Sequence, residues 1–304
     1  MDMRATVSPS PLLLALRPAQ WTKNLLVVAA AFFAYGDPTQ ALPLGAAWRV
    51  AGALLAFCAV SSAVYLLNDV KDRPADRQHP VKRHRPIASG TVRAPVAVAI
   101  AALLGLVGLA GGYGLEPAFA WVLGVYVGLQ ALYTLALKRA ALVDVIVIAC
   151  GFVLRALGGA VVIGVQISPW LLLCTFLLAL FLTLCKRRQE IVTLPEGANP
   201  AGQRAALASY DLRLLDQLIA AIAAATISAY AMYTLSEATL RKFGTAGLGL
   251  TIPFVVFGLF RYLDLVYRHQ RGERPEIILL TDLPLIVNLL LYAAVAAGVF
   301  LLLP

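Results

Sequence analysis

The 304-residue sequence is poor in charged residues. Asp, Glu, Lys and Arg make up 13% of the chain, 61% of the residues are hydrophobic, and the mean hydropathy is +0.81. A soluble globular domain carries about 25% charged residues, and a disordered chain combines low hydrophobicity with high net charge. The composition excludes both classes, and we predict an all-α polytopic membrane protein with a single domain over residues 1–304.

Cysteine and histidine are also scarce, with four and three residues respectively. The cysteines lie far apart in apolar runs without CxxC spacing, which excludes a disulfide-stapled secreted domain and a cysteine metal site. His79 and His84 lack the helical spacing of metal ligands, so we assign them no catalytic role. The segment before Trp21 has only a short apolar run and no small-residue cleavage site, so we expect no cleavable signal peptide.

Long hydrophobic runs are abundant. A helix needs about 20 predominantly apolar residues to cross a bilayer. The sequence predicts nine spans, of which the first and sixth are short: 22–36, 47–68, 94–114, 117–137, 141–165, 169–185, 214–236, 248–267 and 283–303.

The basic residues indicate how these spans are oriented. With a cytoplasmic N-terminus, 21 of the 25 Lys and Arg residues fall on the cytoplasmic side, in agreement with the positive-inside rule. Arg49, Arg241 and Lys242 fall outside, and Arg155 lies within a span. We therefore expect a protein of the cytoplasmic membrane with its N-terminus inside and its C-terminus outside. The same bias explains the net charge of +9 without nucleic-acid binding.

Polar side chains follow the second predicted span, in the segment YLLNDVKDRPAD that begins at Tyr65. On a helix, Tyr65, Asn68, Asp69, Asp72 and Asp76 fall within one arc of about 100°. Crowded carboxylates repel one another and favour a cation, and Mg²⁺ prefers oxygen ligands and shares its coordination shell with phosphates. We predict that Asn68, Asp69, Asp72 and Asp76 bind Mg²⁺ and are catalytic, with Tyr65 beside them.

This segment leaves two questions open. Pro74 should end or kink the helix just before it, which would place Asp76 on a loop. The acids could instead form a solvated helix end paired with Lys71, Arg73 and Arg77. That alternative explains charge at a membrane boundary but not the NDxxDxxxD spacing.

Other basic and aromatic side chains at the same predicted membrane level are candidates for binding phosphates. Arg85 stands before Pro86 in a stiffened turn, whereas Lys82 and Arg83 are equally well explained by topology. The remaining candidates are Lys23 near the N-terminus, Tyr133 and Lys138 after the fourth span, and Lys186, Arg187, Arg188 and Glu190 after the sixth.

Arg155 lies well inside the fifth predicted span. An intramembrane arginine usually faces the bundle interior and pairs with an acid. Arg155 shares a helix face with Asp144, Gly151 and Gly158, and small residues permit close helix approach. A structural ion pair and a direct substrate contact both agree with the sequence.

These segments resemble the UbiA-type intramembrane prenyltransferases over nearly the whole chain. The resemblance is carried by the nine spans, by NDxxDxxxD after the second span, and by RPIASG at 85–90. Within the superfamily the sequence is most similar to the phosphoribosyltransferase branch that acts on decaprenyl phosphate, in RPAQWTKN, YTLALKRAALVDV, GFVLRALGGA and LCKRRQE. The resemblance implies a UbiA-like bundle of nine transmembrane helices with its active site on the cytoplasmic side.

One departure from the superfamily pattern is informative. UbiA prenyltransferases typically have a second aspartate-rich motif after the sixth span, where this sequence has Lys186, Arg187, Arg188 and Glu190. Basic residues there suit a donor with an additional phosphate, such as phosphoribosyl pyrophosphate. The resemblance implies Mg²⁺-dependent transfer of 5-phosphoribose to a polyprenyl phosphate, expected to be decaprenyl phosphate. This would be a step toward the lipid-linked arabinose donor for cell-wall arabinan.

Two other functions stay open. A conventional UbiA enzyme would move a prenyl group from a diphosphate to an aromatic acceptor, and the missing second aspartate motif counts against it. A transporter would be expected to show inverted repeats or interrupted helices in matching halves, and the sequence shows neither. Small-residue faces would permit a homo-oligomer in membrane lipid.

Overall fold

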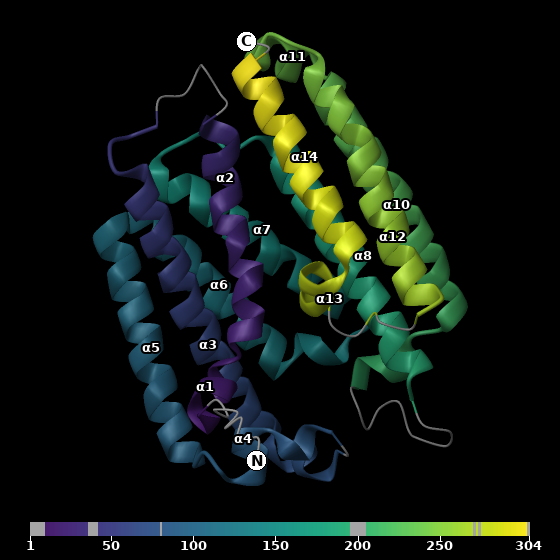
Figure 1. Cartoon of the computed structure of the whole chain (residues 1–304). Coiled ribbons are helices and arrows are strands. Elements are labelled where there is room, and N and C mark those ends of the chain that lie inside the picture. Colours follow the sequence, from purple (N-terminus) through teal and green to yellow (C-terminus); the bar gives the residue numbers. More distant parts are fainter. Residues whose placement is uncertain are drawn as a thin grey trace, which may run out of the picture.

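The computed structural model describes residues 10–35, 42–79, 81–194, 205–269, 272 and 275–302, and every regular element within them is a helix (Figure 1). The longer helices are α2 (Leu26–Tyr35), α3 (Ala46–Gln78), α5 (Ala94–Leu115), α6 (Pro117–Leu135), α7 (Val143–Ile163), α8 (Pro169–Val192), α10 (Leu212–Leu235), α12 (Ile252–Tyr267) and α14 (Leu283–Leu302). The shorter elements are α1 (Pro11–Leu16), η1 (Pro18–Leu25), η2 (Lys82–His84), α4 (Pro86–Ser89), η3 (Leu137–Arg139), η4 (Ala205–Ser209), α11 (Glu237–Phe243), η5 (Gly247–Thr251) and α13 (Pro275–Thr281). The all-α prediction is confirmed.

Seven helices in the described residues are long and apolar enough to span a bilayer: α3, α5, α6, α7, α8, α10 and the segment Gly247–Tyr267 formed by η5 and α12. The protein is therefore a multi-pass integral membrane protein. The first predicted span, 22–36, is shorter as a helix than expected, because its polar beginning belongs to the 3₁₀ helix η1 and only ten residues form α2. The ninth corresponds to α14, whose apolar segment Leu283–Val299 also falls short of the spanning length.

The sixth predicted span is longer in the structure than in the sequence analysis. Helix α8 does not end near 185 but continues to Val192. The basic segment Lys186–Glu190 is consequently helical, and its successive side chains point in directions about 100° apart.

Helix α3 continues through Pro74 to Gln78, so the prediction that Pro74 ends the helix and places Asp76 on a loop is wrong. Proline removes one backbone hydrogen bond, but the turn beyond it is held by its surroundings. Nη1 of Arg85 lies 2.8 Å from Oδ2 of Asp76, and the adjoining Arg77 donates from Nε to the carbonyl oxygen of residue 88 at 3.0 Å.

The long helices lie in two groups (Figure 1). Helices α2, α3, α5, α6 and α7 form one group, α8, α10, α12 and α14 lie on the other side, and α7 packs against α8 between them. The first core surrounds Phe57 and Phe119, whose ring centroids are 5.7 Å apart. The second surrounds Phe181 and Tyr262, at 5.6 Å.

The approach of α7 to its neighbours depends on two glycines. A Cβ added to Gly159 would lie 2.0 Å from the carbonyl oxygen of Val27 on α2, and one added to Gly158 would lie 2.7 Å from the ring of Phe57. The expectation that small residues near Arg155 permit close helix packing is confirmed.

Candidate active site

Three carboxylates of the C-terminal part of α3 form the centre of the site. Asp69 and Asp76 are 3% and 5% exposed, and Nη1 of Arg85 lies 3.3 Å from the first and 2.8 Å from the second. Nζ of Lys138, on η3, lies 2.6 Å from Oδ1 of Asp72. The spacings of three and four residues bring these predicted site residues together with Arg85 and Lys138.

Arg17 is a further member of this cluster, and it is not among the predicted site residues. Its Nη2 lies 2.5 Å from Oδ1 of Asp69, and its guanidinium lies 5.2 Å from the ring centroid of Tyr65. Arg17 links α1 to η1 with φ 56° and ψ 59°, a left-handed conformation that is uncommon for a residue other than glycine. The available signal was its place in RPAQWTKN, the segment that also contains Lys23.

The carboxylates are neutralised by cations from other elements. Arg17, Arg85 and Lys138 face Asp69, Asp72 and Asp76, so three positive charges balance three negative charges. The alternative prediction, in which the acids pair with Lys71, Arg73 and Arg77 of their own helix, is wrong, because the ion pairs of Asp69, Asp72 and Asp76 are made with Arg17, Arg85 and Lys138. Nζ of Lys71, for example, donates to the carbonyl oxygen of residue 134 at 2.9 Å.

A second cluster of charged side chains connects α7 to α8. Arg187 is 1% exposed; its Nε lies 2.7 Å from Oδ2 of Asp144, and its Nη1 lies 2.8 Å from Oε2 of Glu190. The hydroxyl of Tyr210, just after η4, donates to Oδ1 of Asp144 at 2.6 Å and accepts from the backbone N–H of Leu142 at 2.7 Å. Burial, followed by the hydrogen bond to Asp144, raises the pKa of Tyr210. Arg187 and Glu190 thus belong to a buried ion-pair network.

Arg188 is not brought together with the other predicted site residues. Its Nε lies 2.6 Å from Oδ1 of Asp216 on α10, and its guanidinium lies 3.9 Å from the ring centroid of Tyr267 on α12. The reason is helical geometry, since neighbouring residues on α8 project about 100° apart. Arg187 faces α7 whereas Arg188 faces α10 and α12.

Arg155 is buried, at 4% exposure, and is bound by neutral oxygens. Its Nε donates to Oδ1 of Asn24 at 2.7 Å, its Nη2 to the hydroxyl of Tyr126 at 2.9 Å, and its Nη1 to the carbonyl oxygen of Gly151 at 2.6 Å. The expected acidic partner is not found among the described residues, because Asp144 on the same helix face is bound to Arg187 instead.

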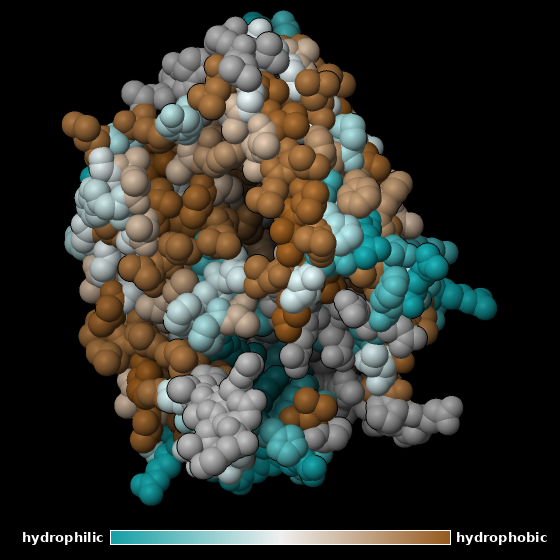
Figure 2. All heavy atoms as spheres, in the orientation of Figure 1, coloured by the Kyte–Doolittle hydropathy of each residue, from teal (hydrophilic) through white to brown (hydrophobic). Residues whose placement is uncertain are grey.

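Two cavities meet near Lys23. The larger, of about 710 Å³, is an apolar chamber lined mainly by α2, α8, α10, α12 and α14, and the face drawn in Figure 2 is hollowed between α2 and α14, with hydrophobic side chains around the opening. The smaller, of about 100 Å³, is lined by Lys23, Lys186, Arg187, Thr183 and apolar side chains. Lys23 and Phe152 line both cavities.

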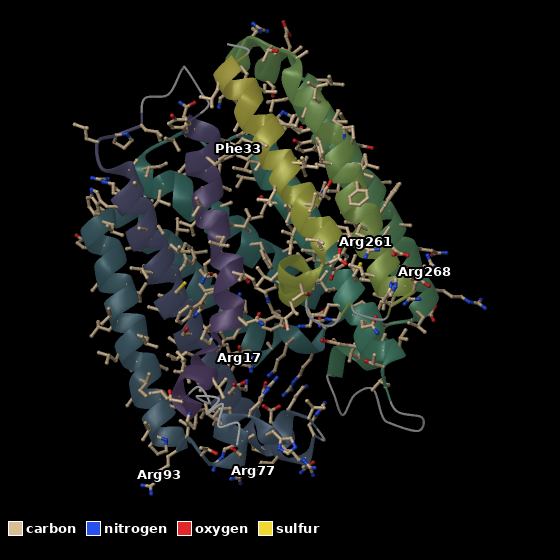
Figure 3. All side chains as sticks on the ribbon, viewed as in Figure 1. Arg17, Phe33, Arg77, Arg93, Arg261 and Arg268 are labelled. Atoms are coloured by element: carbon tan, nitrogen blue, oxygen red, sulfur yellow. The ribbon has the colours of Figure 1, made fainter. Side chains whose placement is uncertain are left out.

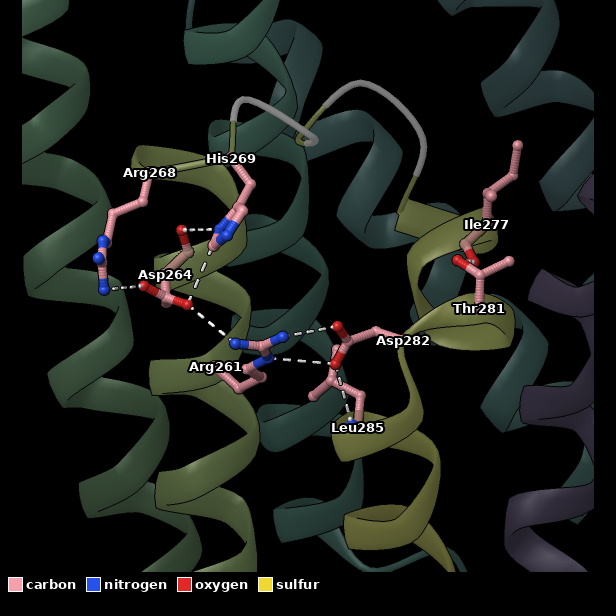
Figure 4. Close-up of polar contacts among 8 residues, drawn as sticks. All are labelled: Arg261, Asp264, Arg268, His269, Ile277, Thr281, Asp282 and Leu285. Atoms are coloured by element: carbon pink, nitrogen blue, oxygen red, sulfur yellow. Dashed lines mark hydrogen bonds and ion pairs between the residues drawn. The ribbon is translucent and has the colours of Figure 1, made fainter.

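The short helix α13 contributes to the wall of the chamber. Leu280 of α13 and Leu285 of α14 line it, and Asp282 lies between them. Arg261 of α12 donates to Asp282 from Nε at 3.2 Å and from Nη2 at 2.9 Å, while Asp282 accepts from the backbone N–H of Leu285 at 3.1 Å (Figure 4). These contacts connect α13 to α12 and α14.

The oxygen-bearing side chains on α3 are of the chemical type that binds Mg²⁺. Carboxylates and an amide are the hard ligands that this ion prefers, and they are supplied by Asn68, Asp69, Asp72 and Asp76. Within the described residues, no group of three or more Asp, Glu, His or Cys side chains is arranged to hold a metal. Mg²⁺ is commonly held by one or two carboxylates together with substrate phosphates. The donor set therefore suits a metal that is bound jointly with a phosphorylated substrate.

A family model described as the UbiA prenyltransferase family matches residues 24–281. The chain belongs to this family. It is 35% identical over 270 residues to a decaprenyl-phosphate phosphoribosyltransferase of Mycobacterium tuberculosis, covering 88% of this chain and 87% of that protein. A protein of the same description from Mycolicibacterium smegmatis is 35% identical over 277 residues, covering 89% and 86%.

The fold is that of solved UbiA homologues. A UbiA homologue from Archaeoglobus fulgidus bound to GPP and Mg²⁺ superposes with a TM-score of 0.72 at 19% identity, covering 96% of this chain and 99% of that chain. The structure of the same homologue bound to DMAPP and Mg²⁺ gives a TM-score of 0.71 and covers 97% and 100%. The coarser prediction, an all-helical polytopic membrane fold that resembles UbiA structures, is confirmed.

Proposed function

We propose that this UbiA family member transfers 5-phosphoribose from phosphoribosyl pyrophosphate to a polyprenyl phosphate, with decaprenyl phosphate as the expected acceptor. The observation that carries the proposal is a carboxylate–cation cluster linked to an apolar chamber through the 3₁₀ helix η1, because Arg17 before η1 contacts Asp69 and Lys23 within η1 lines the chamber. The cluster suits a water-soluble phosphorylated donor, and the chamber suits a lipid tail. The relatives that are 35% identical over most of the chain support the same activity.

The donor is assigned to the cluster on α3. Arg17, Arg85 and Lys138 already lie against carboxylates, so a small movement of each side chain presents it to a phosphate oxygen. Guanidinium and ammonium groups form strong charge-assisted hydrogen bonds with phosphates. Asp69 and Asp72, with Asn68 and Asp76 beside them, would hold Mg²⁺. When bound, the metal supplies neutralisation of the charge on the leaving pyrophosphate.

The reaction needs no general base from the protein. A phosphate monoester has a second pKa of about 6, so the acceptor is largely a dianion at neutral pH. One of its oxygens forms a bond to C1 of the ribose while the bond from C1 to the pyrophosphate oxygen breaks, and pyrophosphate leaves with the electron pair. Charge at C1 develops as in other glycosyl transfers. The protein's residues bind and orient the two substrates and balance the charge of the leaving group.

The topology proposed for this activity has the carboxylate cluster on the cytoplasmic side, nine membrane passages, and a C-terminus on the outer side. The concentration of basic residues at one end supports it, since Arg17, Arg77 and Arg93 lie at the same end of the molecule in Figure 3. Arg241 and Lys242 of α11 lie at the opposite end (Figure 1). Helices α2 and α14 supply the two passages that are short as regular helices.

The geometry favours this reaction over prenyl transfer from a diphosphate. The C-terminal part of α8, where a second carboxylate motif would be required, carries Glu190, which is bound to the buried Arg187. Lys186 contributes positive charge there instead. Such a surface suits phosphate groups better than a second metal.

A direct assay tests the proposal. The purified protein in detergent is incubated with ribose-labelled phosphoribosyl pyrophosphate and decaprenyl phosphate, with Mg²⁺ or with excess EDTA. We expect a lipid-soluble labelled product only with Mg²⁺. Absence of product from folded protein, together with prenyl transfer from a prenyl diphosphate to an aromatic acceptor, would overturn it.

A further inference from the structure

The 3₁₀ helix η1 connects the two parts of the candidate active site. Arg17, immediately before η1, contacts Asp69, and Lys23 within η1 lines the apolar chamber. A 3₁₀ helix has poorer hydrogen-bond geometry than an α-helix and is uncommon beyond about three to four residues, whereas η1 has eight residues. Contacts with the surrounding helices are therefore needed to hold η1 in place.

Side chains of α3 hold η1 near both of its ends. Nε1 of Trp21 donates to Oγ of Ser62 at 3.0 Å, and this hydroxyl donates to the carbonyl oxygen of Leu16 at 3.0 Å. Nδ2 of Asn24 donates to Oγ of Ser61 at 3.3 Å. These contacts place η1 along α3, the helix that carries the carboxylates of the site.

Arg155 of α7 connects the end of η1 to two further helices. Its Nε donates to Oδ1 of Asn24 at 2.7 Å, and its Nη2 donates to the hydroxyl of Tyr126 on α6 at 2.9 Å. Asn24 and Arg155 are 0% and 4% exposed. A guanidinium presents its donors in a planar, fixed arrangement. The packing of α6 against α7 therefore determines the position of Asn24, and with it the position of the end of η1.

Helix packing alone does not explain a buried arginine at this position. Taking a cation out of water is costly, and a neutral side chain of similar volume would pack α6 against α7 without that cost. Asp144 on the same helix face is bound to Arg187. A charged residue within a membrane span usually marks a functional site. Arg155 lines neither of the two cavities near Lys23, which favours an indirect role over contact with a substrate.

The other end of η1 determines where Arg17 lies. The carbonyl oxygen of Arg17 accepts the backbone N–H of Gln20 at 2.9 Å, so the backbone of Arg17 is joined to the first turn of η1. Its guanidinium lies against Asp69. Because η1 is one continuous helix, a displacement at Asn24 is carried to Arg17 and to its contact with the carboxylate cluster.

We propose that Arg155 is a positioning residue of the donor site. Through Asn24 it fixes η1, and η1 in turn holds the guanidinium of Arg17 against Asp69, where the phosphates of the donor bind. Arg155 itself has no contact with the substrate. The assignment rests on the proposed function for the identity of the donor.

The test uses variants that remove individual hydrogen bonds of the Arg155 guanidinium. Asn24→Leu removes the bond to η1, whereas Tyr126→Phe removes the bond to α6, keeps the aromatic ring and serves as the matched control. Asn24→Asp keeps an oxygen acceptor for Arg155 but loses the donor to Ser61, so it shows which of these two contacts of Asn24 matters. The double variant Asn24→Leu/Arg155→Met is included because Asn24→Leu alone leaves a buried cation with fewer partners.

Local opening and donor binding are measured separately on the full-length protein in detergent. Hydrogen–deuterium exchange of the peptide covering residues 17–25 reports the opening of η1 without any substrate. Steady-state kinetics gives the KM for phosphoribosyl pyrophosphate, and equilibrium binding of the labelled donor with Mg²⁺ separates binding from turnover. Thermal unfolding shows whether each variant is folded.

We expect Asn24→Leu and the double variant to raise the donor KM and the exchange rate of η1 by about tenfold, as for the loss of one charge-assisted hydrogen bond. Tyr126→Phe and Asn24→Asp should stay within about twofold of the wild type in both properties. In an Arg17→Gln background, Asn24→Leu should change the donor KM by less than about twofold, because the group through which it acts is absent.

Two results would overturn the assignment. Equal effects of Tyr126→Phe and Asn24→Leu on the donor KM would make Arg155 a packing residue. Additive effects of Asn24→Leu and Arg17→Gln would show that Arg155 acts independently of Arg17.

The failure of the proposed function gives a different result. If the wild-type protein forms no phosphoribosyl product but Asn24→Leu, unlike Tyr126→Phe, speeds exchange in η1, the link from Arg155 to η1 stands and the reaction is wrong. If product forms while neither the exchange nor the donor KM responds to Asn24→Leu, the reaction stands and the positioning role is wrong.

Discussion

Nη2 of Arg17 lies 2.5 Å from Oδ1 of Asp69, although the two residues are 52 positions apart in the chain. The contact joins the strained turn between α1 and η1 to the carboxylate segment of α3. It places a guanidinium against the carboxylate of Asp69 before a metal or a donor is bound. It also places a guanidinium where the donor's phosphates are proposed to lie.

Arg17→Gln should raise the KM for the donor by about 10- to 100-fold, because it removes a charge-assisted contact worth about 1.5–3 kcal/mol. The KM for the acceptor lipid should change little. Steady-state kinetics with each substrate varied in turn makes the measurement, with Arg93→Gln at the exposed start of α5 as the matched control. An unchanged donor KM would remove Arg17 from the site.

Asp69→Asn and Asp72→Asn should each abolish turnover while leaving the protein folded. Asparagine preserves the shape of the side chain but loses the charge that binds a hard cation. Turnover is measured over a range of Mg²⁺ concentrations, and folding by thermal unfolding in detergent. Asp211→Asn, at the exposed start of α10, is the control and should retain activity. Near-normal activity in both site variants would contradict the assignment of Asp69 and Asp72 as Mg²⁺ ligands.

Asp144→Leu should lower the thermal unfolding temperature strongly, because it leaves the buried Arg187 without one of its two carboxylate partners. Breaking a buried ion pair in this way costs about 3–5 kcal/mol. The double variant Asp144→Leu/Arg187→Met removes both charges and should recover part of the loss. If the double variant is no more stable than Asp144→Leu alone, the ion pair does not stabilise the packing of α7 against α8.

Tyr210→Phe should destabilise the protein by about 1–2 kcal/mol, since it removes the phenolic hydrogen bond to Asp144. Burial and that hydrogen bond raise the pKa of Tyr210 above its usual value of about 10. Its contribution is therefore fully present below the unfolded-state pKa and is lost as pH rises through the higher folded-state pKa. The difference in unfolding temperature between wild type and variant should stay constant from about pH 7 to pH 10. A difference that shrinks across this range would contradict the pKa shift.

Arg188→Gln should leave the donor KM within about twofold of the wild-type value. Its guanidinium is held by Asp216 and lies over Tyr267, away from the carboxylates of α3. The expected effect is a modest loss of thermal stability. A large rise in the donor KM would show that Arg188 reaches the substrate, as the sequence alone suggested.

The class of the protein and the residue types of the candidate site were predictable from the amino-acid sequence. Low charge and long apolar runs are typical of chains that span a membrane. The spans are then expected to be helices, because backbone N–H and C=O groups in lipid must form their hydrogen bonds within the segment. The spacing of Asp69, Asp72 and Asp76 follows helical periodicity, so their common face was predictable. Arg85 and Lys138 were predictable as basic residues at the same membrane level.

The pairing of the charged side chains depends on how the helices pack. Arg17 reaches Asp69 across 52 residues, and Asp144 pairs with Arg187 rather than with Arg155 on its own helix. Local sequence patterns do not predict these pairings, because the partner of a long side chain depends on which helices pack beside it. The continuation of α3 beyond Pro74 has the same origin, since contacts from Arg85 and Arg77 hold a turn that the local sequence disfavours.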